Sequence, residues 1–146
     1  MKNRVEVLHG VNLDALGRRD PEHYGTITLH ELELRIKRYA FELQLEVRFF
    51  QSNREGEFVE YLHRLPELAD AAVINAGAWT HYSYAIRDAL EIAGLPAVEV
   101  HLSAVQEREE WRRHSVFEGV VTGVVAGKGP EGYREALEMI KAELEG

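Results

Sequence analysis

The 146-residue sequence contains no cysteine, only four prolines, and fewer basic residues than acidic ones, 17 against 25. Without cysteine, disulfides, thiolate catalysis and cysteine-ligated zinc sites are excluded. The formal net charge of -8 argues against a nucleic-acid coat or an anionic membrane surface as a partner. An anionic ligand would therefore have to meet positive charge that is concentrated locally.

Long apolar runs are also missing, since no stretch approaches the roughly 18 residues that a membrane-spanning helix needs. The first four residues lead into a short strand-like segment rather than into a signal-peptide core. We therefore expect a cytoplasmic protein without a membrane partner. With 45% hydrophobic and 29% charged residues, the composition is that of a globular protein, and the length predicts a single domain over residues 1–146.

Short apolar segments alternate with amphipathic segments along the whole chain. The expected strands cover residues 4–10, 45–52, 70–77, 95–103 and 119–127, and the expected helices cover 28–43, 56–65, 81–94 and 131–145. Thr28 with Glu31, and Ser52 with Glu55, have the spacing of capping boxes at helix starts. Apolar strands alternating with helices predict a doubly wound α/β domain, in which helices cover both faces of a parallel sheet.

Polar residues follow several of these strands, and ligands of such sheets bind outside the carboxyl ends of the strands. Asn12 follows the first strand, and Asn75 and His81 follow the third. Each also has an ordinary explanation, because Asn75 before Ala-Gly is typical of a turn and His81 suits a surface position near a helix start. A neutral imidazole at that position can instead bind a ligand oxygen.

The fourth strand carries a stronger signal in "VEVHLS", residues 98–103. Alternation along a strand places Glu99 and His101 on the same face. A carboxylate beside a histidine orients the imidazole and raises its proton affinity, which suits acid–base catalysis. A buried salt bridge with a purely structural role gives the same pattern.

The segment "REEWRRHS", residues 108–115, contributes three arginines, Arg108, Arg112 and Arg113. They are one possible source of local positive charge for an anion. A solvated helical face on which they pair with Glu109 and Glu110 explains the same spacing.

The opening loop "LGRRDPEHYG", residues 16–25, places Arg18 and Arg19 close to Tyr24. A tyrosine before glycine in a loop is commonly a packing residue. A phenol surrounded by guanidinium groups, however, can lose its proton below the usual pKa of about 10 and then act as a general base. The loop is bounded by glycines, so it can serve as a lid that carries a base.

Six motifs, taken together, resemble the type II 3-dehydroquinate dehydratases. They are NLxxLGxRxPxxYG (12–25), QSNxEGE (51–57), INAGAxTHxSxAxRDAL (74–90), VEVHLS (98–103), REExRRHS (108–115) and GxGPEGYxxAL (127–137). The match is in order and covers nearly the whole chain.

The resemblance implies a flavodoxin-like, five-stranded parallel sheet and a single catalytic domain over residues 1–146. It implies dehydration of 3-dehydroquinate to 3-dehydroshikimate, a step of the shikimate pathway, without a cofactor, a Schiff base or a metal. It also implies a trimer-based homo-oligomer that assembles into a homododecamer.

Roles in this family carry over to matching residues. Tyr24 resembles the base that removes a C2 proton, and Asn12 resembles the residue that steadies the enolate through an ordered water. Arg19 matches the lid arginine that stabilises charge, and His101, oriented by Glu99, matches the acid that protonates the departing C1 hydroxyl.

The remaining matches concern substrate binding and assembly. Arg108 matches the arginine held near the tyrosine, and Asp88 resembles a residue that reaches the site of a neighbouring subunit. The other positions that match substrate-binding residues are Asn75, His81, Leu102, Ser103 and Arg112.

The sequence departs from the family in a few places. His9 and Val11 replace the usual Asn and Pro of the first loop, and Ala104 and Gln106 replace an Asn and a His. "NREG" stands in place of the more familiar "NHEG". Because the predicted base, acid and arginines are kept, these departures bear on loop rigidity, hydrogen bonding and rate rather than on the reaction class.

Two other classes of function share this order of elements. A flavodoxin or receiver module is one, although the first loop lacks a phosphate cradle and the paired acids that these modules use. A catalytically weak structural or regulatory homologue is the other, given the altered first loop.

Overall fold

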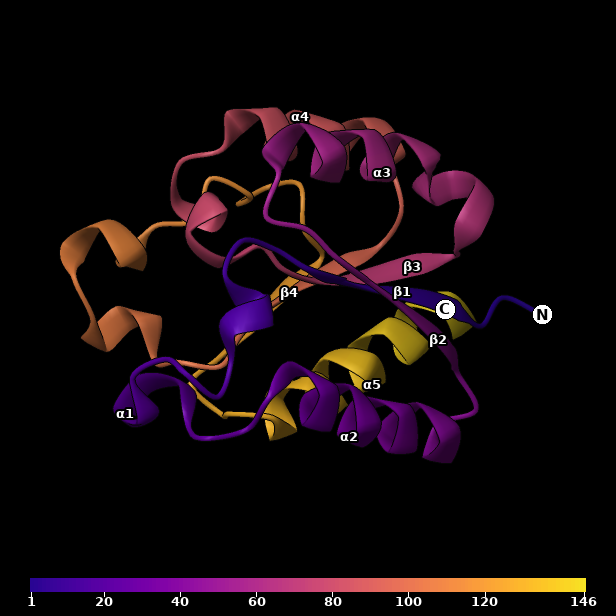
Figure 1. Cartoon of the computed structure of the whole chain (residues 1–146). Coiled ribbons are helices and arrows are strands. Elements are labelled where there is room, and N and C mark those ends of the chain that lie inside the picture. The colour runs from indigo at the N-terminus through magenta and orange to yellow at the C-terminus, as the bar shows by residue number, and fades with distance from the viewer.

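The computed structural model describes residues 1–146, and its five strands form one parallel sheet in the order β2-β1-β3-β4-β5 (Figure 1). The strands are β1 (Arg4–His9), β2 (Glu46–Gln51), β3 (Ala71–Asn75), β4 (Ala97–His101) and β5 (Gly123–Ala126). This strand order is that of flavodoxin-like folds. The predicted α/β architecture is therefore confirmed.

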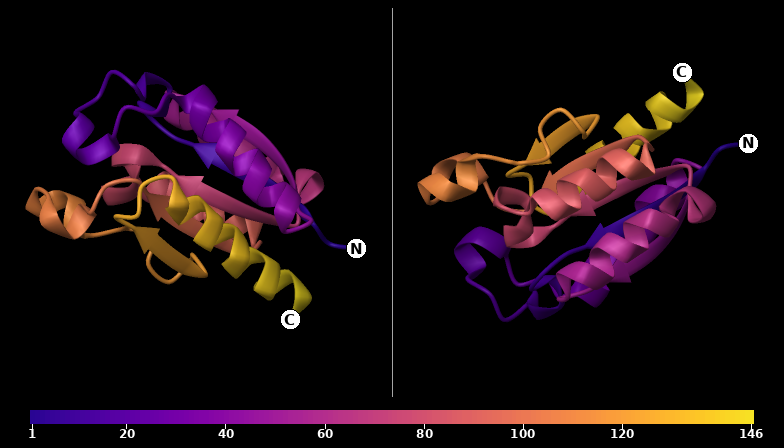
Figure 2. Two further views of the ribbon diagram at one scale, coloured as in Figure 1. Left: turned by 90° about the horizontal axis from the view of Figure 1, so that it is seen from below. Right: turned by 90° about the horizontal axis from the view of Figure 1, so that it is seen from above.

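Helices cover both faces of the sheet, as Figure 2 shows from below and from above. The covering helices are α2 (Leu29–Glu42), α3 (Glu55–Leu68), α4 (Tyr84–Ala93) and α5 (Glu131–Glu145), and the short helix α1 (Pro21–Tyr24) lies at the end of the sheet. Alternation along β1 divides the core, because Val5 and Val7 pack on the side of α2 and α5 whereas Leu8 packs on the side of α3 and α4.

Burial of the strands follows their place in the sheet. Every residue of β3 and β4 is buried, and so is β1 after Arg4, whereas the edge strands β2 and β5 are only partly covered. Continuous burial is expected for central strands with helices on both faces.

One of the two predicted capping boxes is confirmed and the other is wrong. At Thr28, the side chain accepts the N–H of Glu31 at 3.1 Å and the Glu31 carboxylate accepts the N–H of Thr28 at 2.9 Å. Ser52 instead accepts the N–H of Arg54 at 3.0 Å, and Arg54 is the residue that precedes α3. The Ser52 hydroxyl therefore stabilises a turn ahead of the helix and does not cap α3.

The last strand is shorter than predicted, 123–126 instead of 119–127. The N–H groups of Val120 and Val121 both donate to the carbonyl of Phe117, at 2.9 and 3.2 Å. Their donors are thus used in a turn and cannot join the ladder to β4.

None of the helices is long and apolar enough to cross a membrane. The cytoplasmic location stays a prediction.

Two irregular segments extend beyond the carboxyl ends of the strands. One carries α1, and the other contains two short 3-10 helices, Val105–Glu107 and Glu110–Arg113. Figures 1 and 2 show both at the end of the sheet opposite the N-terminus. The opening loop and the arginine-rich segment therefore lie together at the edge where α/β sheets bind ligands.

A buried acid lies in the body of the sheet, away from this edge. The Glu6 side chain is 1% exposed, and the nearest cation is Arg48, whose Nε is 3.9 Å from Oε1. Burial raises the pKa of Glu6, and the Tyr61 hydroxyl and Arg48 oppose that rise. Burial and the nearby Glu6 in turn raise the pKa of Tyr61 to about 12.

Glu6→Gln should stabilise the fold at neutral pH. Since the folded-state pKa of Glu6 is raised, the wild-type chain loses stability as the pH rises through that pKa. The glutamine variant lacks this loss, so its melting temperature should exceed that of the wild type by a few °C at pH 7, roughly the effect of 1 kcal/mol. The gain should shrink toward pH 4.

Thermal unfolding between pH 4 and 8 measures the difference. Glu46→Gln is the matched control, because Glu46 is an exposed acid at the start of β2. A gain at pH 7 that persists unchanged at pH 4, or that the control shares, would contradict the role given to Glu6 ionisation.

Candidate active site

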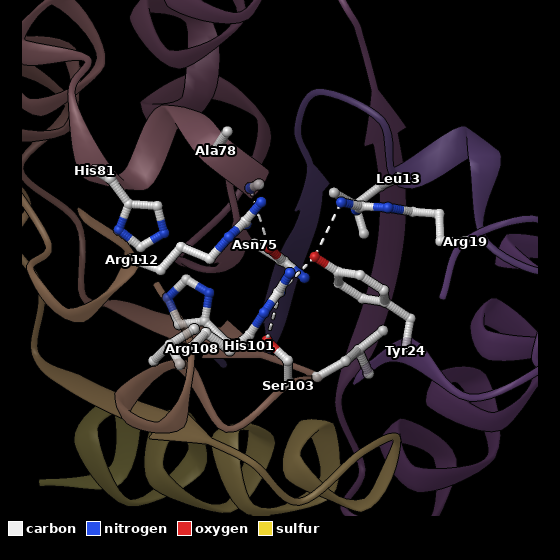
Figure 3. A pocket seen from close by; sticks show the side chains of 13 residues that line it. Leu13, Arg19, Tyr24, Asn75, Ala78, His81, His101, Ser103, Arg108 and Arg112 are labelled. Atoms are coloured by element: carbon white, nitrogen blue, oxygen red, sulfur yellow. Dashed lines mark hydrogen bonds between the residues drawn. The ribbon is translucent and has the colours of Figure 1, made fainter. Parts of the chain in front are cut away.

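A pocket opens at the carboxyl ends of β1, β3 and β4 (Figure 3). Its lining comes from the opening loop, from the segments after β3 and β4, and from the arginine-rich segment. The lining residues are Leu13, Arg19, Tyr24, Asn75, Gly77, Ala78, His81, His101, Leu102, Ser103, Val105, Arg108 and Arg112. Nine of the predicted site residues are thus brought together from segments far apart in the sequence.

Tyr24 is held between two arginines. Its hydroxyl oxygen accepts a hydrogen bond from Arg19 Nη2 at 2.9 Å and another from Arg108 Nη1 at 2.5 Å (Figure 3). The Arg19 guanidinium also lies over the phenol ring, 3.9 Å from its centroid. Two charged donors at one phenol oxygen stabilise negative charge on that oxygen.

The positive charge that this acidic chain requires for an anionic ligand is concentrated here. Arg19, Arg108 and Arg112 line the pocket, and no aspartate or glutamate does. Burial lowers the pKa of Arg19 despite Tyr24, and Arg112 and Arg108 add to the lowering. The paired acids of a receiver module are absent from this pocket.

The solvated-face interpretation of the arginine-rich segment is wrong for two of its three arginines. The side chains of Arg108 and Arg112 are only 8% and 16% exposed, although Glu109 lies 3.6 Å from Arg108 Nε and 3.1 Å from Arg112 Nε. Arg113 is exposed and fits the solvated interpretation.

His101 and Glu99 form a buried pair, as alternation along β4 predicted. His101 Nε2 lies 2.5 Å from Glu99 Oε2, and the Glu99 side chain is 2% exposed. The ring lines the pocket while the carboxylate lies behind it, so Nδ1 is left for a ligand. The geometry thus fits both interpretations of the pattern, a buried structural contact and a histidine placed to transfer a proton.

His81 faces His101 across the pocket, with ring centroids 6.1 Å apart. Its Nδ1 is 2.7 Å from the carbonyl of His114, and a carbonyl can only accept, so Nδ1 carries a proton. Burial lowers the pKa of His81. The ring is therefore neutral at pH 7 and leaves Nε2 as an acceptor for a ligand hydroxyl.

Asn75 satisfies both interpretations of its position. Its Oδ1 accepts the N–H of Gly77 at 3.1 Å, which caps the turn after β3. The same residue lines the pocket and is 6% exposed. The turn bond takes up the amide oxygen, so the NH2 group is the part of the side chain that can donate to a ligand oxygen.

Three predicted residues are not part of the pocket lining: Glu99, which lies behind His101, and Asn12 and Asp88, which lie farther away. Asn12 is exposed, has a φ of 70°, and donates its backbone N–H to Asn53 Oδ1 at 2.8 Å. Asp88 is exposed on the outer side of α4, one helical turn from Tyr84 and from Ile92, which are 66% and 67% exposed. Asp88 therefore points away from the pocket of its own chain.

Comparison with known proteins agrees with this geometry. The sequence profile described as dehydroquinase class II matches residues 3–141. The chain belongs to the class II dehydroquinase family.

A Syntrophotalea carbinolica protein named 3-dehydroquinate dehydratase is 51% identical over 145 residues, which cover 96% of this chain and 98% of that protein. The crystal structure of a type II dehydroquinase from Propionibacterium acnes superposes with a TM-score of 0.91 at 42% identity, covering 97% of this chain and 98% of the other. A type II dehydroquinase from Butyrivibrio crossotus gives 0.91 at 40% identity, covering 95% and 97%.

The departures from the family pattern have identifiable contacts. His9 is fully buried, stacks on Phe49, and places Nε2 3.1 Å from Glu33 Oε2 on α2. Gln106 donates to the carbonyl of Arg113 at 2.9 Å, which braces the arginine-rich segment. In the first loop, Gln51 donates to the carbonyl of Gly10 at 3.2 Å. Hydrogen bonds thus hold the loop that lacks the family's proline.

Four lining residues, Leu13, Gly77, Ala78 and Val105, are not among the predicted site residues. Gly77 carried a recognisable signal, a glycine just after a strand that ends in asparagine. Its φ is 64°, and a Cβ there would lie 2.5 Å from the carbonyl oxygen of Val11. Only glycine fits this position without displacing the first loop.

Within the chain, no group of three or more histidine, aspartate or glutamate side chains is arranged to hold a metal ion.

Proposed function

We propose that the whole chain, residues 1–146, acts as one catalytic domain that dehydrates 3-dehydroquinate to 3-dehydroshikimate through an enolate, with Tyr24 as base and His101 as acid. The observation that carries the proposal is the position of the Tyr24 oxygen between the guanidinium groups of Arg19 and Arg108. Membership of the class II dehydroquinase family supports the substrate and the reaction.

In the first step, the Tyr24 phenolate removes a proton from C2, next to the carbonyl carbon. The electron pair of the broken C–H bond moves onto the carbonyl oxygen and forms an enolate. A proton next to a ketone is weakly acidic, so the base needs charge stabilisation at the enolate as well. Arg19, on the lid, stabilises the developing negative charge. We assign to Asn12 the stabilisation of the enolate through an ordered water.

In the second step, the enolate electrons return to form the C1=C2 double bond while the C1–O bond breaks. His101 donates its proton to the leaving oxygen, which departs as water. Glu99 keeps the ring oriented and stabilises the imidazolium before the transfer. The base and the acid thus act in sequence on adjacent carbons.

Substrate recognition uses positively charged and backbone donors for the carboxylate and neutral side chains for the hydroxyls. Arg112 and the backbone N–H groups of Leu102 and Ser103 suit its carboxylate, and the neutral His81 and the fixed amide of Asn75 suit its hydroxyls. We assign Arg108 to positioning the Tyr24 side chain and stabilising its phenolate form.

A chemical test separates this route from Schiff-base or metal catalysis. The thirteen lining residues include no lysine, so no pocket amine can form an imine with the ketone. The expected result is that borohydride with substrate, and prolonged treatment with a chelator, leave the rate of conjugated-enone formation unchanged. Time-dependent inactivation by either treatment would contradict the proposed route.

We further propose that Asp88 acts in the site of a neighbouring subunit of a trimer, and that trimers assemble into a homododecamer. The exposed position of Asp88 between Tyr84 and Ile92 supports a contact at this face of α4. Light scattering should report a multiple of three chains.

Mixed assemblies test the shared site directly. In assemblies co-expressed from Asp88→Ala and Tyr24→Phe chains, some sites combine an intact Tyr24 with an Asp88 supplied by the neighbour. Activity should therefore exceed the sum of the two separate variants. Purely additive activity, or a fully active monomer, would exclude the contribution of Asp88 from another subunit.

A further inference from the structure

Ser115 does not line the pocket, yet it is the second partner of the Glu99 carboxylate. Its Oγ is 2.8 Å from Glu99 Oε1 and 3.1 Å from the backbone nitrogen of Phe117. The Phe117 N–H occupies an acceptor lone pair of the hydroxyl, and a carboxylate can only accept. The hydroxyl proton therefore points at Glu99.

The two oxygens of Glu99 consequently have different partners. Oε2 faces His101 Nε2 at 2.5 Å, and Oε1 faces Ser115. The carboxylate is 2% exposed, so it depends on these two groups in place of bulk water. A buried carboxylate is costly wherever an oxygen lacks a donor.

The chain on both sides of Ser115 is fixed by hydrogen bonds. The carbonyl of His114 holds His81 Nδ1 at 2.7 Å. On the other side, the Val116 N–H donates to the carbonyl of Thr80 at 2.8 Å, and Arg87 donates to the carbonyl of Val116 at 2.7 Å. Ser115 is thus attached to the segment after β3, which carries another part of the pocket.

We propose that Ser115 is a positioning residue that fixes Glu99 as an ionised acceptor, so that the proton to be transferred stays on His101. This inference rests on the proposed function, in which His101 is the acid. Ser115 touches neither the pocket nor the reacting atoms, and it acts through Glu99 alone.

Loss of the hydroxyl has two consequences for the pair. The Glu99 Oε1 atom is left buried without a donor, so the carboxylate gains freedom to turn away from His101. A hydrogen bond to a carboxylate favours its charged form, so loss of the Ser115 hydroxyl favours the protonated form of Glu99. A protonated Glu99 no longer stabilises the imidazolium, and turnover falls.

Ser115→Ala should lower kcat roughly tenfold, the scale of one hydrogen bond to a charged group. KM should change by less than about twofold, because the groups assigned to substrate binding are untouched. The acid-side limb of the kcat–pH profile should move to higher pH. Ser115→Thr keeps the donor and should restore both kcat and the profile.

Ser83→Ala is the matched control. Ser83 is also a buried hydroxyl, and it accepts the N–H of Ile86 at 3.1 Å at the start of α4, without contact to Glu99 or His101. Its loss should lower the melting temperature and leave the pH profile unchanged. Should Ser115→Ala fail to fold, Ser115→Cys, with a weak donor of similar size, should give a displaced profile in its place.

A wild-type kcat and profile in the folded Ser115→Ala chain, or in its Cys substitute, would overturn the inference. So would an equal loss of kcat in the Ser83 control, because the effect would then be one of stability. The His101→Asn variant distinguishes failure of the proposed function from failure of the inference about Ser115. If it is nearly as active as the wild type, the proposed acid is wrong; if it is inactive while the Ser115 variants match the wild type, only the inference fails.

Discussion

Replacing Tyr24 by phenylalanine should lower kcat by roughly 100-fold or more, the usual scale for a general base. The substitution removes one oxygen and keeps the ring that lies under the Arg19 guanidinium. Packing of the opening loop is therefore retained while the proton acceptor is lost. Ligand affinity should stay close to that of the wild type, because Arg112, His81 and Asn75 are unchanged.

Tyr39→Phe provides a matched control for the loss of a phenol that binds an arginine. The Tyr39 hydroxyl accepts from Arg35 at 3.0 Å and donates to Glu131 at 2.9 Å, between α2 and α5 and outside the pocket. The control should cost stability and leave kcat unchanged. Steady-state kinetics, together with an equilibrium measurement of product-analogue binding, separates loss of turnover from loss of ligand affinity. Near-native turnover in the Tyr24→Phe variant would show that Tyr24 is not the base.

Local patterns predicted the parts of the fold that depend on neighbouring residues. Alternation in "VEVHLS" placed Glu99 and His101 on one face, where His101 Nε2 and Glu99 Oε2 form a hydrogen bond of 2.5 Å. Alternating strands and helices predicted the parallel sheet, and the strand-end rule predicted the edge where the pocket lies.

Contacts between distant segments were beyond such patterns. Arg108 meets Tyr24 across 84 positions of sequence. The sequence offered the arginines of 108–113 as candidate partners of the phenol, and only the family resemblance singled out Arg108. The bond between Ser115 and Glu99 likewise depends on how the segment after β4 folds back. Even the local rule failed at Ser52, because the chain ahead of α3 offered the hydroxyl a nearer donor, the N–H of Arg54.

Replacing His101 by asparagine should uncouple the two chemical steps. Asparagine can donate an N–H to Glu99 and so satisfy the buried carboxylate, but it cannot deliver a proton to the leaving oxygen. Dehydration should fall roughly 100-fold, the scale of general acid catalysis. Tyr24 and its two arginines remain, so C2 deprotonation should continue and the enolate should mostly return to substrate.

Deuterium reveals that return. In D2O, the phenol formed when Tyr24 takes the C2 proton exchanges with solvent, and the enolate then recovers deuterium at C2. For His101→Asn, mass spectrometry of the remaining 3-dehydroquinate should show deuterium entering faster than the enone appears. Tyr24→Phe, run beside it, should show neither process above the enzyme-free rate. If the His101 variant loses exchange and dehydration to the same extent, His101 is required for deprotonation as well, and its assignment as an acid that acts only in the second step is wrong.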